Sequence, residues 1–363
     1  MFRVTLAFAG RAGAIASAIV SAIAFAAFTA YPSVADPIEI TDDTGRRLRF
    51  DAPLERAIIF NRYNAELIRA IAGTGVIVGV DSFVTRDPSY WPSLRPGMLA
   101  GQGQSEPNYE AIVALEPDVV IFPRNGVYNE AIRTLAPFNI PVVVLTGWDV
   151  LKHVENVEKY GRMFGAADKA RKLNEFYLRY MNLLARRLEG VQPKKVYLEE
   201  VTPFRSVLPG SGWHDMIEAA GGVNVFADLD IATQPRERGS VHNFEVDPEA
   251  VLMYDPMLVA KLQPGSYPLH PPGFAEAFFR EFVARPGMDE VTALKEGQVF
   301  HMNYYLAGGC SKMTGALSLA KWLHPERFAD IDPDEVMRVW IEEFQGVPYP
   351  GRYWTSINEV PID

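Results

Sequence analysis

The sequence predicts an α/β protein whose two lobes are joined by one long helix. Short apolar runs alternate along the chain with helical patterns, and this alternation is typical of α/β domains. An amphipathic pattern runs unbroken from Ala167 to Leu188, which is about six turns of helix. A second series of apolar runs and helical patterns follows it. We therefore expect a first lobe at 36–165, a linker helix at 166–190 and a second lobe at 191–363.

The N-terminal segment at 1–35 is predicted to be a secretory signal peptide. Arg3 and Arg11 precede an alanine-rich apolar run at 13–30, and the triplet at 33–35 is a small-x-small cleavage site. The alternative is an N-terminal membrane anchor, because the run is close to the spanning length of about 20 residues. The alanine content and the triplet favour cleavage, so we expect a mature chain that is free in the periplasm.

The elements of the first lobe follow in a regular order. Gly45 sets the turn of a predicted β-hairpin at 38–50. Apolar runs rich in β-branched residues predict buried parallel strands, at 57–60, 76–80, 119–122 and 142–145. Helical patterns separate these runs. One follows the run at 57–60 and ends at 71, and two others lie at 109–115 and 129–135.

The second lobe repeats this alternation after the linker helix. Strand-like runs are found at 196–201, 257–262 and 298–302. Helical patterns are found at 215–220, 248–254, 274–284, 315–323 and 333–344. The order of strands and helices predicts a second α/β layer structure like the first.

Composition and charge exclude several classes of protein. The 363 residues include 35 Lys and Arg against 45 Asp and Glu, and a net charge of −10 argues against nucleic acid or anionic membranes as partners. Cys310 is the only cysteine, so neither an internal disulfide nor a thiolate metal cluster can form. We expect His153 and His324 to be surface or capping residues of helices. No HExxH, Walker A, G-x-G-x-x-G or G-x-S-x-G signature is present, and the predicted export of an acidic two-lobed chain favours capture of a ligand over catalysis.

Arginine and aromatic side chains are concentrated in the segments that follow the predicted strands. Carboxyl ends of parallel strands meet at one edge of a sheet, so these side chains are expected where the lobes face each other. Guanidinium groups pair with carboxylate or catecholate oxygens and aromatic rings stack on flat groups, which suits a bulky anionic ligand. The predicted ligand-binding residues are Arg62, Tyr63, Tyr90, Trp91, Arg124, Trp148, Arg205, His242, Tyr304 and Tyr305. Taken singly, each of them also fits a core or surface position.

Several segments, in their order and spacing, carry a resemblance to a known family. They read ITDDTGRR at 40–47, PLERAI at 53–58, PNYEAIVALEPDVVI at 107–121, GGVNVF at 221–226, VDPEAV at 246–251 and LAKWLHPE at 319–326. Along nearly its whole mature length the chain resembles the bacterial substrate-binding proteins of ABC importers that capture iron–siderophore complexes, haem and cobalamin. The resemblance implies the class III periplasmic-binding-protein fold, which has two Rossmann-like lobes joined by a single long helix. It also implies that the protein is not an enzyme.

Two glutamates lie at the starts of predicted helices in corresponding places of the two lobes. Glu110 follows the N-capping Asn108, and Glu249 follows the N-capping Asp247. Carboxylates in a first turn are stabilised by the helix dipole, and this alone accounts for one such residue. For the pair, the resemblance implies that Glu110 and Glu249 dock on arginines of the membrane permease.

The resemblance implies an extracytoplasmic receptor that captures an iron chelate, a ferric siderophore, without altering it. Its partners would be an ABC permease dimer with its ATPase subunits and the small-molecule chelate, and we expect a monomer without a cofactor of its own. Haem and cobalamin are the alternative ligands, and for haem an axial ligand could be His242, Tyr304 or Tyr305. The alternative of a different class is a secreted hydrolase or metalloenzyme.

Overall fold

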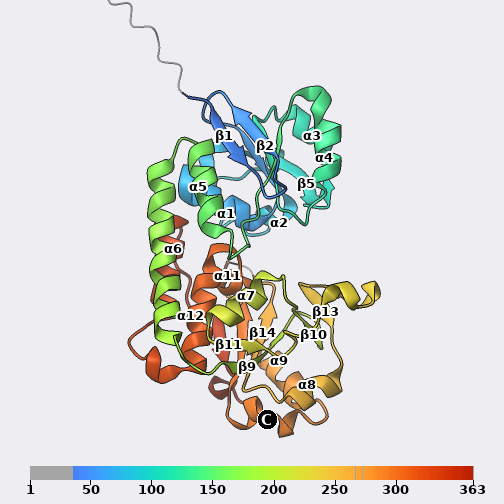
Figure 1. Ribbon diagram of the computed structural model, residues 1–363, viewed down its shortest axis with the longest axis vertical. Coiled ribbons are helices and arrows are strands. Elements are labelled where there is room, and N and C mark those ends of the chain that lie inside the picture. Colours follow the sequence, from blue (N-terminus) through green and yellow to red (C-terminus); the bar gives the residue numbers. More distant parts are fainter. Residues whose placement is uncertain (1–35, 266, 272, 363) are drawn as a thin grey trace, which may run out of the picture. The chain divides into compact units, whose positions relative to one another are not determined.

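Two sheets, one in each lobe, carry the fold of the computed structural model (Figure 1). The structure describes residues 36–265, 267–271 and 273–362, and the chain from Pro37 onward groups into one compact unit. The predicted signal peptide lies outside the described residues. Within those residues, no helix has both the length and the apolar character that a membrane span requires.

The predicted hairpin opens the first lobe and is confirmed. It consists of β1 (Ile38–Thr41) and β2 (Arg47–Phe50), which pair antiparallel. Gly45 turns the chain with φ of +82°, a left-handed conformation that costs glycine little. The Asp42 carboxylate accepts a hydrogen bond from the backbone N–H of Thr44 at 3.0 Å and so fixes the turn.

The first lobe is built on a six-stranded sheet of order β6-β5-β4-β3-β7-β8. Every neighbouring pair is parallel except β5 with β6, as the apolar runs predict for most of the sheet. The strands are β3 (Ala57–Ile59), β4 (Ile77–Asp81), β5 (Leu99–Gly103), β6 (Glu106–Pro107), β7 (Val119–Phe122) and β8 (Val142–Val144). The sequence analysis does not predict β5, because the sequence LAGQG has two glycines and no β-branched residue.

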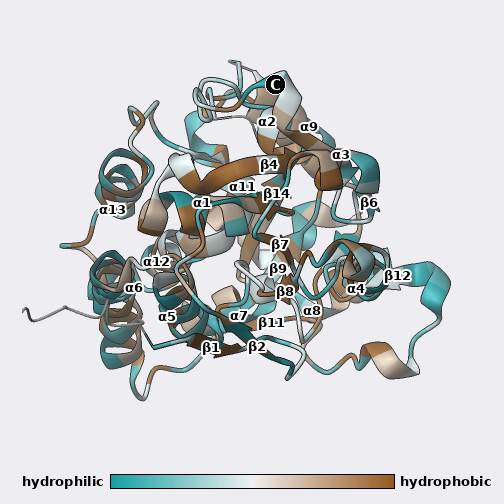
Figure 2. Ribbon diagram, turned by 90° about the horizontal axis from the view of Figure 1, so that it is seen from above, coloured by the Kyte–Doolittle hydropathy of each residue, from teal (hydrophilic) through white to brown (hydrophobic). Residues whose placement is uncertain are grey.

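Helices cover both faces of this sheet. They are α1 (Arg62–Ala72), α2 (Ser82–Thr85), α3 (Tyr109–Ala114), α4 (Tyr128–Leu135) and α5 (His153–Met163). Side chains alternate between the faces, so that Ile59 contributes to the core shared with the rest of the molecule and Ile58 to a separate core under α3 and α4. In Figure 2 β4 is largely brown, as expected for a strand covered on both faces.

Helix α6 (Ala167–Leu188) connects the lobes and coincides with the predicted helix. Its buried stripe includes Leu173, Tyr177 and Leu184, whereas its other face is charged and largely teal in Figure 2. The hydrophobic effect therefore holds one side of α6 against both lobes along its length.

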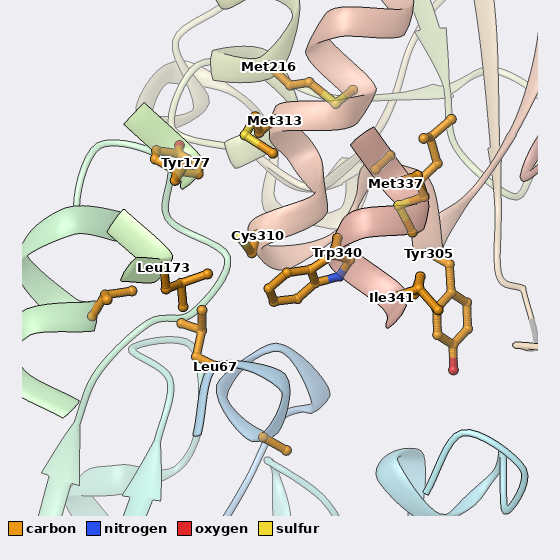
Figure 3. Close-up of a cluster of buried hydrophobic side chains, with 14 of the residues drawn as sticks. Leu67, Leu173, Tyr177, Met216, Tyr305, Cys310, Met313, Met337, Trp340 and Ile341 are labelled. Atoms are coloured by element: carbon orange, nitrogen blue, oxygen red, sulfur yellow. The ribbon is translucent and has the colours of Figure 1, made fainter. Parts of the chain in front are cut away.

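A single core crosses from the first lobe through α6 to the second. Figure 3 shows Leu67 of α1 and Leu173 of α6 beside Met313 and Trp340 of the second lobe. All four side chains are at most 1% exposed. Because burial of such side chains stabilises a fold by about 1.5 to 3 kcal/mol each, this core joins the lobes as well as stabilising them.

The second lobe has a mixed sheet of order β12-β13-β10-β9-β14-β15-β16, with β11 paired to β9. β9, β11, β14 and β15 are parallel, whereas β10, β12, β13 and β16 join antiparallel. The strands are β9 (Lys194–Glu199), β10 (Arg205–Ser206), β11 (Gly222–Asn224), β12 (Gly239–Ser240), β13 (Asn243–Glu245), β14 (Leu258–Gln263), β15 (Val299–Asn303) and β16 (Trp354–Ser356). The sequence analysis predicts only β9, β14 and β15, because the other strands have two or three residues and no continuous apolar run.

The helices predicted for the second lobe are confirmed, with boundaries that move by up to three residues except at 333–344. The helices of this lobe are α7 (Gly212–Ala219), α8 (Pro248–Tyr254), α9 (Phe274–Val283), α10 (Thr292–Lys295), α11 (Tyr304–Ala307), α12 (Lys312–Leu323) and α13 (Pro333–Val339). Two of them, α10 and α11, are short and were not predicted. The predicted helix at 333–344 continues beyond α13 as a π-helical turn, η9 (Trp340–Phe344). Short 3-10 turns are found at Thr74–Val76, Pro96–Met98, Ala136–Phe138, Ile231–Thr233, Arg236–Arg238, Met288–Glu290, Gly309–Ser311, Pro325–Arg327 and Ile357–Glu359.

Candidate functional site

A cavity of about 1070 Å³ lies where the carboxyl ends of strands from the two lobes face each other. First-lobe segments after β3, β4 and β5 line it, among them Asn61, Ser82 and Gln104. The second lobe contributes Pro264 after β14 and Tyr304 after β15. Small-molecule sites usually measure about 300 to 1,000 Å³, so this cavity can accept a bulky ligand.

Asn61 shapes the first-lobe side of this cavity. Its φ of +84° is uncommon for a residue other than glycine but is tolerated by asparagine. Its side chain accepts a hydrogen bond from the N–H of Tyr63 at 3.0 Å, which caps α1, and donates one to Gln104 Oε1 at 3.0 Å. Asp81, at the end of β4, accepts from the N–H of Asn61 at 2.7 Å. These bonds hold the first residues of α1, Arg62 and Tyr63, at the cavity.

Arg62 places its positively charged guanidinium group against two aromatic rings at the cavity. Its guanidinium carbon lies 5.0 Å from the ring centroid of Tyr63 and 4.2 Å from that of Tyr305, within range of a cation–π interaction. Its Nε is 3.5 Å from a carboxylate oxygen of Glu66, which is also buried. Burial raises the pKa of Glu66, against the opposing effect of Arg62. The rings and this carboxylate therefore hold the guanidinium in place beside the cavity.

The same cavity has polar and aromatic groups on its other walls. The Arg86 guanidinium lies 3.9 Å from the ring centroid of Phe83, whose side chain is half exposed. From the second lobe, the Tyr304 hydroxyl donates to Glu200 Oε2 at 2.6 Å. Burial raises the pKa of Glu200, although the hydrogen bond from Tyr304 acts in the other direction. The walls thus combine arginines with aromatic rings.

A smaller cavity of about 160 Å³ adjoins the large one, and Asn61 lines both. Trp148 lines it from the first lobe, and Trp213, His242 and Lys312 line it from the second. The edge of His242 meets the Trp148 ring, with centroids 4.8 Å apart. The small cavity therefore also lies between the lobes.

Lys312, the first residue of α12, supplies the charge of the small cavity. Its side chain is 3% exposed, and its Nζ donates to the backbone carbonyl of Trp148 at 2.8 Å. The rings of Tyr63, Trp148 and Trp213 lie 5.7 to 5.9 Å from this nitrogen. No carboxylate among the described residues forms an ion pair with it. An ammonium group in such a place can pair with an anionic ligand without first leaving a carboxylate.

Burial also lowers the pKa values of two basic side chains that line the small cavity, Lys312 and His242. It lowers the pKa of Lys312 to about 7, although the charges of Asp215 and Asp149 act in the other direction. It lowers the pKa of His242 to about 4, with help from nearby positive charges, so this imidazole is neutral at pH 7. The Nδ1 of His242 lies 3.1 Å from Ser211 Oγ.

The N-termini of α1 and α7 border the small cavity. Asn61 caps α1 and Ser211 caps α7, and both line the cavity together with Gly212. A Cβ at Gly212 would lie 2.7 Å from the Trp148 carbonyl oxygen and 3.0 Å from Lys312 Nζ, so only glycine fits between them. The partial positive charge of helix N-termini adds to that of the ammonium group and favours an anion.

Of the ten ligand-binding residues predicted from the sequence, five line these cavities. Arg62, Tyr63 and Tyr304 line the large one, and Trp148 and His242 line the small one. Arg124 and Tyr305 lie directly behind them: Arg124 stacks on the Trp148 ring at 4.7 Å, and Tyr305 lies under Arg62.

The structure places the remaining three elsewhere, contrary to the prediction. Tyr90 and Trp91 are 0% and 1% exposed and pack on the guanidinium of Arg69 at 4.2 and 3.9 Å, so they belong to the core. Arg205 forms an ion pair with Glu245 at 2.9 Å and lines neither cavity. These side chains follow strands as the others do, but other side chains of the fold occupy them, and for Tyr90 these include Tyr267 and Tyr305 of the second lobe.

Alanine substitutions of Arg124 and Arg205 should distinguish an arginine beside the ligand cavities from one outside them. Arg124→Ala removes a positive charge and the group that stacks on Trp148, and we expect it to weaken ligand binding up to about tenfold. Arg205→Ala should leave the affinity unchanged, because Arg205 contacts Glu245 and the Arg238 carbonyl instead. Titration of both variants with a ferric siderophore, followed by tryptophan fluorescence, measures the difference. A larger loss for Arg205→Ala would contradict this placement.

The histidines and the cysteine do not form a metal centre within the part of the chain that the structure describes, where no three His, Cys, Asp or Glu side chains come together. His153 and His324 were expected to be surface or capping residues of helices. Both are buried, at 3% and 2% exposed, and His324 is the C-cap of α12. His153 stacks on Tyr177 of α6 at 3.7 Å, and burial lowers its pKa to about 3. His324 lies 3.1 Å from the Gly221 carbonyl. Both helices pack against the linker side of the molecule, which a one-dimensional pattern does not reveal. Cys310 is a buried thiol.

Sequence reasoning missed Lys312, Trp213 and Ser211 as parts of the site. All three belong to helix starts in the second lobe rather than to segments directly after strands. One signal was available: Lys312 is the only charged residue between 297 and 320 apart from His301, in an otherwise apolar and small-residue stretch. A lone lysine in such a stretch is expected to be buried, and a buried lysine needs a function or a partner.

Comparison with known proteins agrees with the two-lobed geometry. The sequence profile of the family described as periplasmic binding protein matches residues 58–306, more than half of the chain. The chain belongs to this family. This periplasmic binding protein is therefore a substrate-binding receptor of the kind that serves ABC importers, and not an enzyme.

Individual relatives of this periplasmic binding protein differ in the ligands that their names state. The molybdate-binding protein MolA of Haemophilus influenzae is 27% identical over 88% of this chain and 93% of its own length. The vitamin B12-binding protein of Salmonella typhi is 26% identical over 48% of this chain and 63% of its own length.

Solved structures show the same fold. The TroA-like periplasmic binding protein FepB of Veillonella parvula superposes with a TM-score of 0.71 at 21% identity, over 89% of this chain and all of that chain. MolA bound to molybdate superposes with a TM-score of 0.68 at 23% identity, over 86% of this chain and 98% of that one. The predicted class III fold is thus confirmed.

Proposed function

We propose that this periplasmic binding protein captures an iron chelate, a ferric siderophore, between its lobes and delivers it to an ABC permease. The observation that carries the proposal is the cavity of about 1070 Å³, which has two arginines and aromatic rings in its walls. Arg62 and Arg86 suit the carboxylate or catecholate oxygens of a chelate, and Tyr63, Phe83 and Tyr304 suit its flat groups.

A second candidate is a free oxyanion of the molybdate type. The observation that favours it is the small cavity of about 160 Å³ beside Lys312. There an ammonium group that forms no ion pair with any described residue meets two helix N-termini. A relative that matches most of the chain is named for molybdate. In this reading the oxyanion sits at Lys312, and the large cavity is its entrance.

Binding measurements decide between these ligands. The chain, purified without ligand, is titrated by calorimetry with a ferric catecholate siderophore, haem, cobalamin and molybdate, and native mass spectrometry of protein exported by its own host identifies any co-purified ligand by mass. Tight binding of the ferric siderophore alone supports the first proposal, and tight binding of molybdate alone supports the second. Preference for haem or cobalamin would contradict both.

Export and partners belong to the same proposal. Cleavage at the predicted site after residue 35 would release the chain into the periplasm, where it would act as a monomer on a permease dimer with its ATPase subunits. Mass spectrometry of the protein recovered from its host tests this, since a mature N-terminus at Asp36 is expected. An intact N-terminus would instead favour the membrane anchor.

We further propose that Glu110 and Glu249 register the receptor on the permease. Both are exposed, in the first turns of α3 and α8. Figure 1 shows α3 and α8 in different lobes, both on the side away from α6. Exposed carboxylates in such places steer association through charge and contribute little to stability, typically about 0.3 to 1 kcal/mol.

The double variant Glu110→Ala, Glu249→Ala should therefore bind ligand normally and still lower both uptake by cells and ligand-stimulated ATP hydrolysis by the reconstituted importer. Reversal of both charges to arginine should be worse, because like charges would then face each other. The matched control is Glu158→Ala, Glu296→Ala, which removes one exposed carboxylate from each lobe. Normal uptake by the double-arginine variant would leave Glu110 and Glu249 as ordinary helix-start residues.

A further inference from the structure

A third cavity, of about 460 Å³, lies where α6 meets both lobes. It shares no lining residue with the two ligand cavities. Its walls come from α1 and the segment after Trp91 in the first lobe, from the start of α6, and from the segment at 343–347 in the second lobe. The charged residues in these walls are Arg69, Lys169, Lys172 and Glu343.

Positive charge exceeds negative charge in this cavity. Lys169 and Lys172 lie one turn apart on the exposed face of α6. No ion pair involves Lys169 among the described residues, and the Nζ of Lys172 is 4.0 Å from the Glu343 carboxylate, with both side chains more than half exposed. A contact of that length between exposed groups is weak, so both ammonium groups are available to a ligand.

Arg69 adds a third cation, which is buried. It is 8% exposed, and its Nε donates to Gln345 Oε1 at 2.7 Å. Its Nη1 donates to the Tyr90 carbonyl, whereas its Nη2 has no hydrogen-bond partner among the residues that the structure describes. Glu66 is the one buried carboxylate of α1, and it also faces Arg62. A buried guanidinium that is only partly satisfied is costly in a fold, and a nearby anion reduces that cost.

Neutral groups complete a polar wall. The side chains of Thr74 and Ser93 carry hydroxyl groups that can donate to an anion, and both residues line the cavity. Gln345 connects the lobes here, because it accepts from Arg69 and its amide donates to the Glu66 carbonyl at 3.1 Å. A ligand in this cavity would therefore touch α6 and both lobes at once.

We propose that this hinge-side cavity is a second binding site, for a small anion of the phosphate class such as phosphate or pyrophosphate. Three cations against one carboxylate supply the attraction, and the hydroxyl groups supply neutral donors. Since the walls belong to α6 and to both lobes, the bound anion would favour one spacing of the lobes. The site is independent of which ligand occupies the cleft.

Calorimetric titration of the full chain with pyrophosphate tests the proposal. Wild type should show saturable binding, and Lys169→Gln, Lys172→Gln should weaken it about tenfold or more through the loss of two charge-assisted contacts. The matched control is Arg179→Gln, Arg186→Gln, which removes two exposed charges from the same helix outside the cavity. Lys312→Met is titrated in parallel, because any pyrophosphate bound in the cleft would be lost in this variant, whereas binding at the hinge-side cavity would remain.

Three results would overturn the proposal. The first is the absence of saturable pyrophosphate binding to wild type. The second is an equal loss in both glutamine double variants, which would indicate general electrostatic attraction. The third is a loss in Lys312→Met alone, which would place the pyrophosphate in the cleft.

Discussion

Lys312→Met is expected to weaken binding of an anionic ligand about a hundredfold, because a buried charge-assisted contact is worth about 1.5 to 3 kcal/mol. Methionine keeps the length of the side chain but removes its charge. The same substitution should stabilise the fold below pH 7, since an ammonium group that is 3% exposed and has no ion-pair partner in the described part of the chain is costly to bury. Opposite changes in affinity and stability are the signature of a residue retained for binding.

The pH dependence of wild type provides an independent measurement. Folding lowers the pKa of Lys312 from 10.5 to about 7, so the unfolded chain binds a proton that the folded chain has lost between these values. The free energy of unfolding should therefore rise with pH in this window, and Lys312→Met should lack that contribution. Affinity for molybdate should be highest below pH 7 and fall above it, as the ammonium group loses its proton.

Lys321→Met is the matched control for this experiment. Lys321 lies in the last turn of the same helix, donates to the Ile331 carbonyl and lines neither ligand cavity. Its substitution should leave the affinity unchanged. If Lys312→Met titrates molybdate and a ferric siderophore as wild type does, then Lys312 is not the anion-binding group.

Glu199→Gln is expected to lower the free energy of unfolding by about 3 to 5 kcal/mol, the usual cost of breaking a buried ion pair. The Glu199 carboxylate is 0% exposed and accepts from Lys261 Nζ at 2.9 Å and from Arg285 at 2.7 Å. A neutral side chain would leave Lys261 buried without its carboxylate, and Arg285 would keep only the exposed carboxylate of Glu281 at 3.0 Å. Urea unfolding at pH 7 measures the loss.

The effect should also reach the cleft. Lys261 Nζ donates to the backbone carbonyls of Glu200 at 2.6 Å and Val201 at 3.0 Å, which fixes the end of β9. Glu200 in turn accepts from Tyr304 in the wall of the large cavity. Weaker ligand binding by folded Glu199→Gln is therefore expected along with the lower stability.

Acid should reduce the difference between Glu199→Gln and wild type. Burial alone would raise the pKa of Glu199, but the hydrogen bond from Arg285 and the charge of Lys261 hold it below its ordinary value of 4.5. The stability from this carboxylate is present above 4.5 and lost as the pH falls through the lower folded value. Glu290→Gln is the control, because its pair with Lys295 is exposed and such pairs contribute little to stability. A similar loss for both variants would contradict a special role for Glu199.

The sequence by itself determined the linker helix, the main parallel strands and the family. Apolar positions at three and four residues define α6 from end to end, and unbroken apolar runs define β7 and most of β3 and β4. These signals are local, because period and composition express which faces of an element are buried. Short antiparallel strands such as β10 were not predicted from the sequence, because their pairing depends on partners such as β13 that lie far along the chain.

Only the tertiary structure decided which side chains reach the cleft. Tyr90 and Arg62 were both predicted to contact the ligand. Tyr90 is buried and packs against the Arg69 guanidinium, whereas Arg62 lines the large cavity. Lys312 carried no site motif, and it enters the cleft because α12 begins there and Gly212 leaves room for its ammonium group. The physical reason is that exposure and ionisation depend on what packs against a side chain from other elements, and a linear pattern does not contain that information.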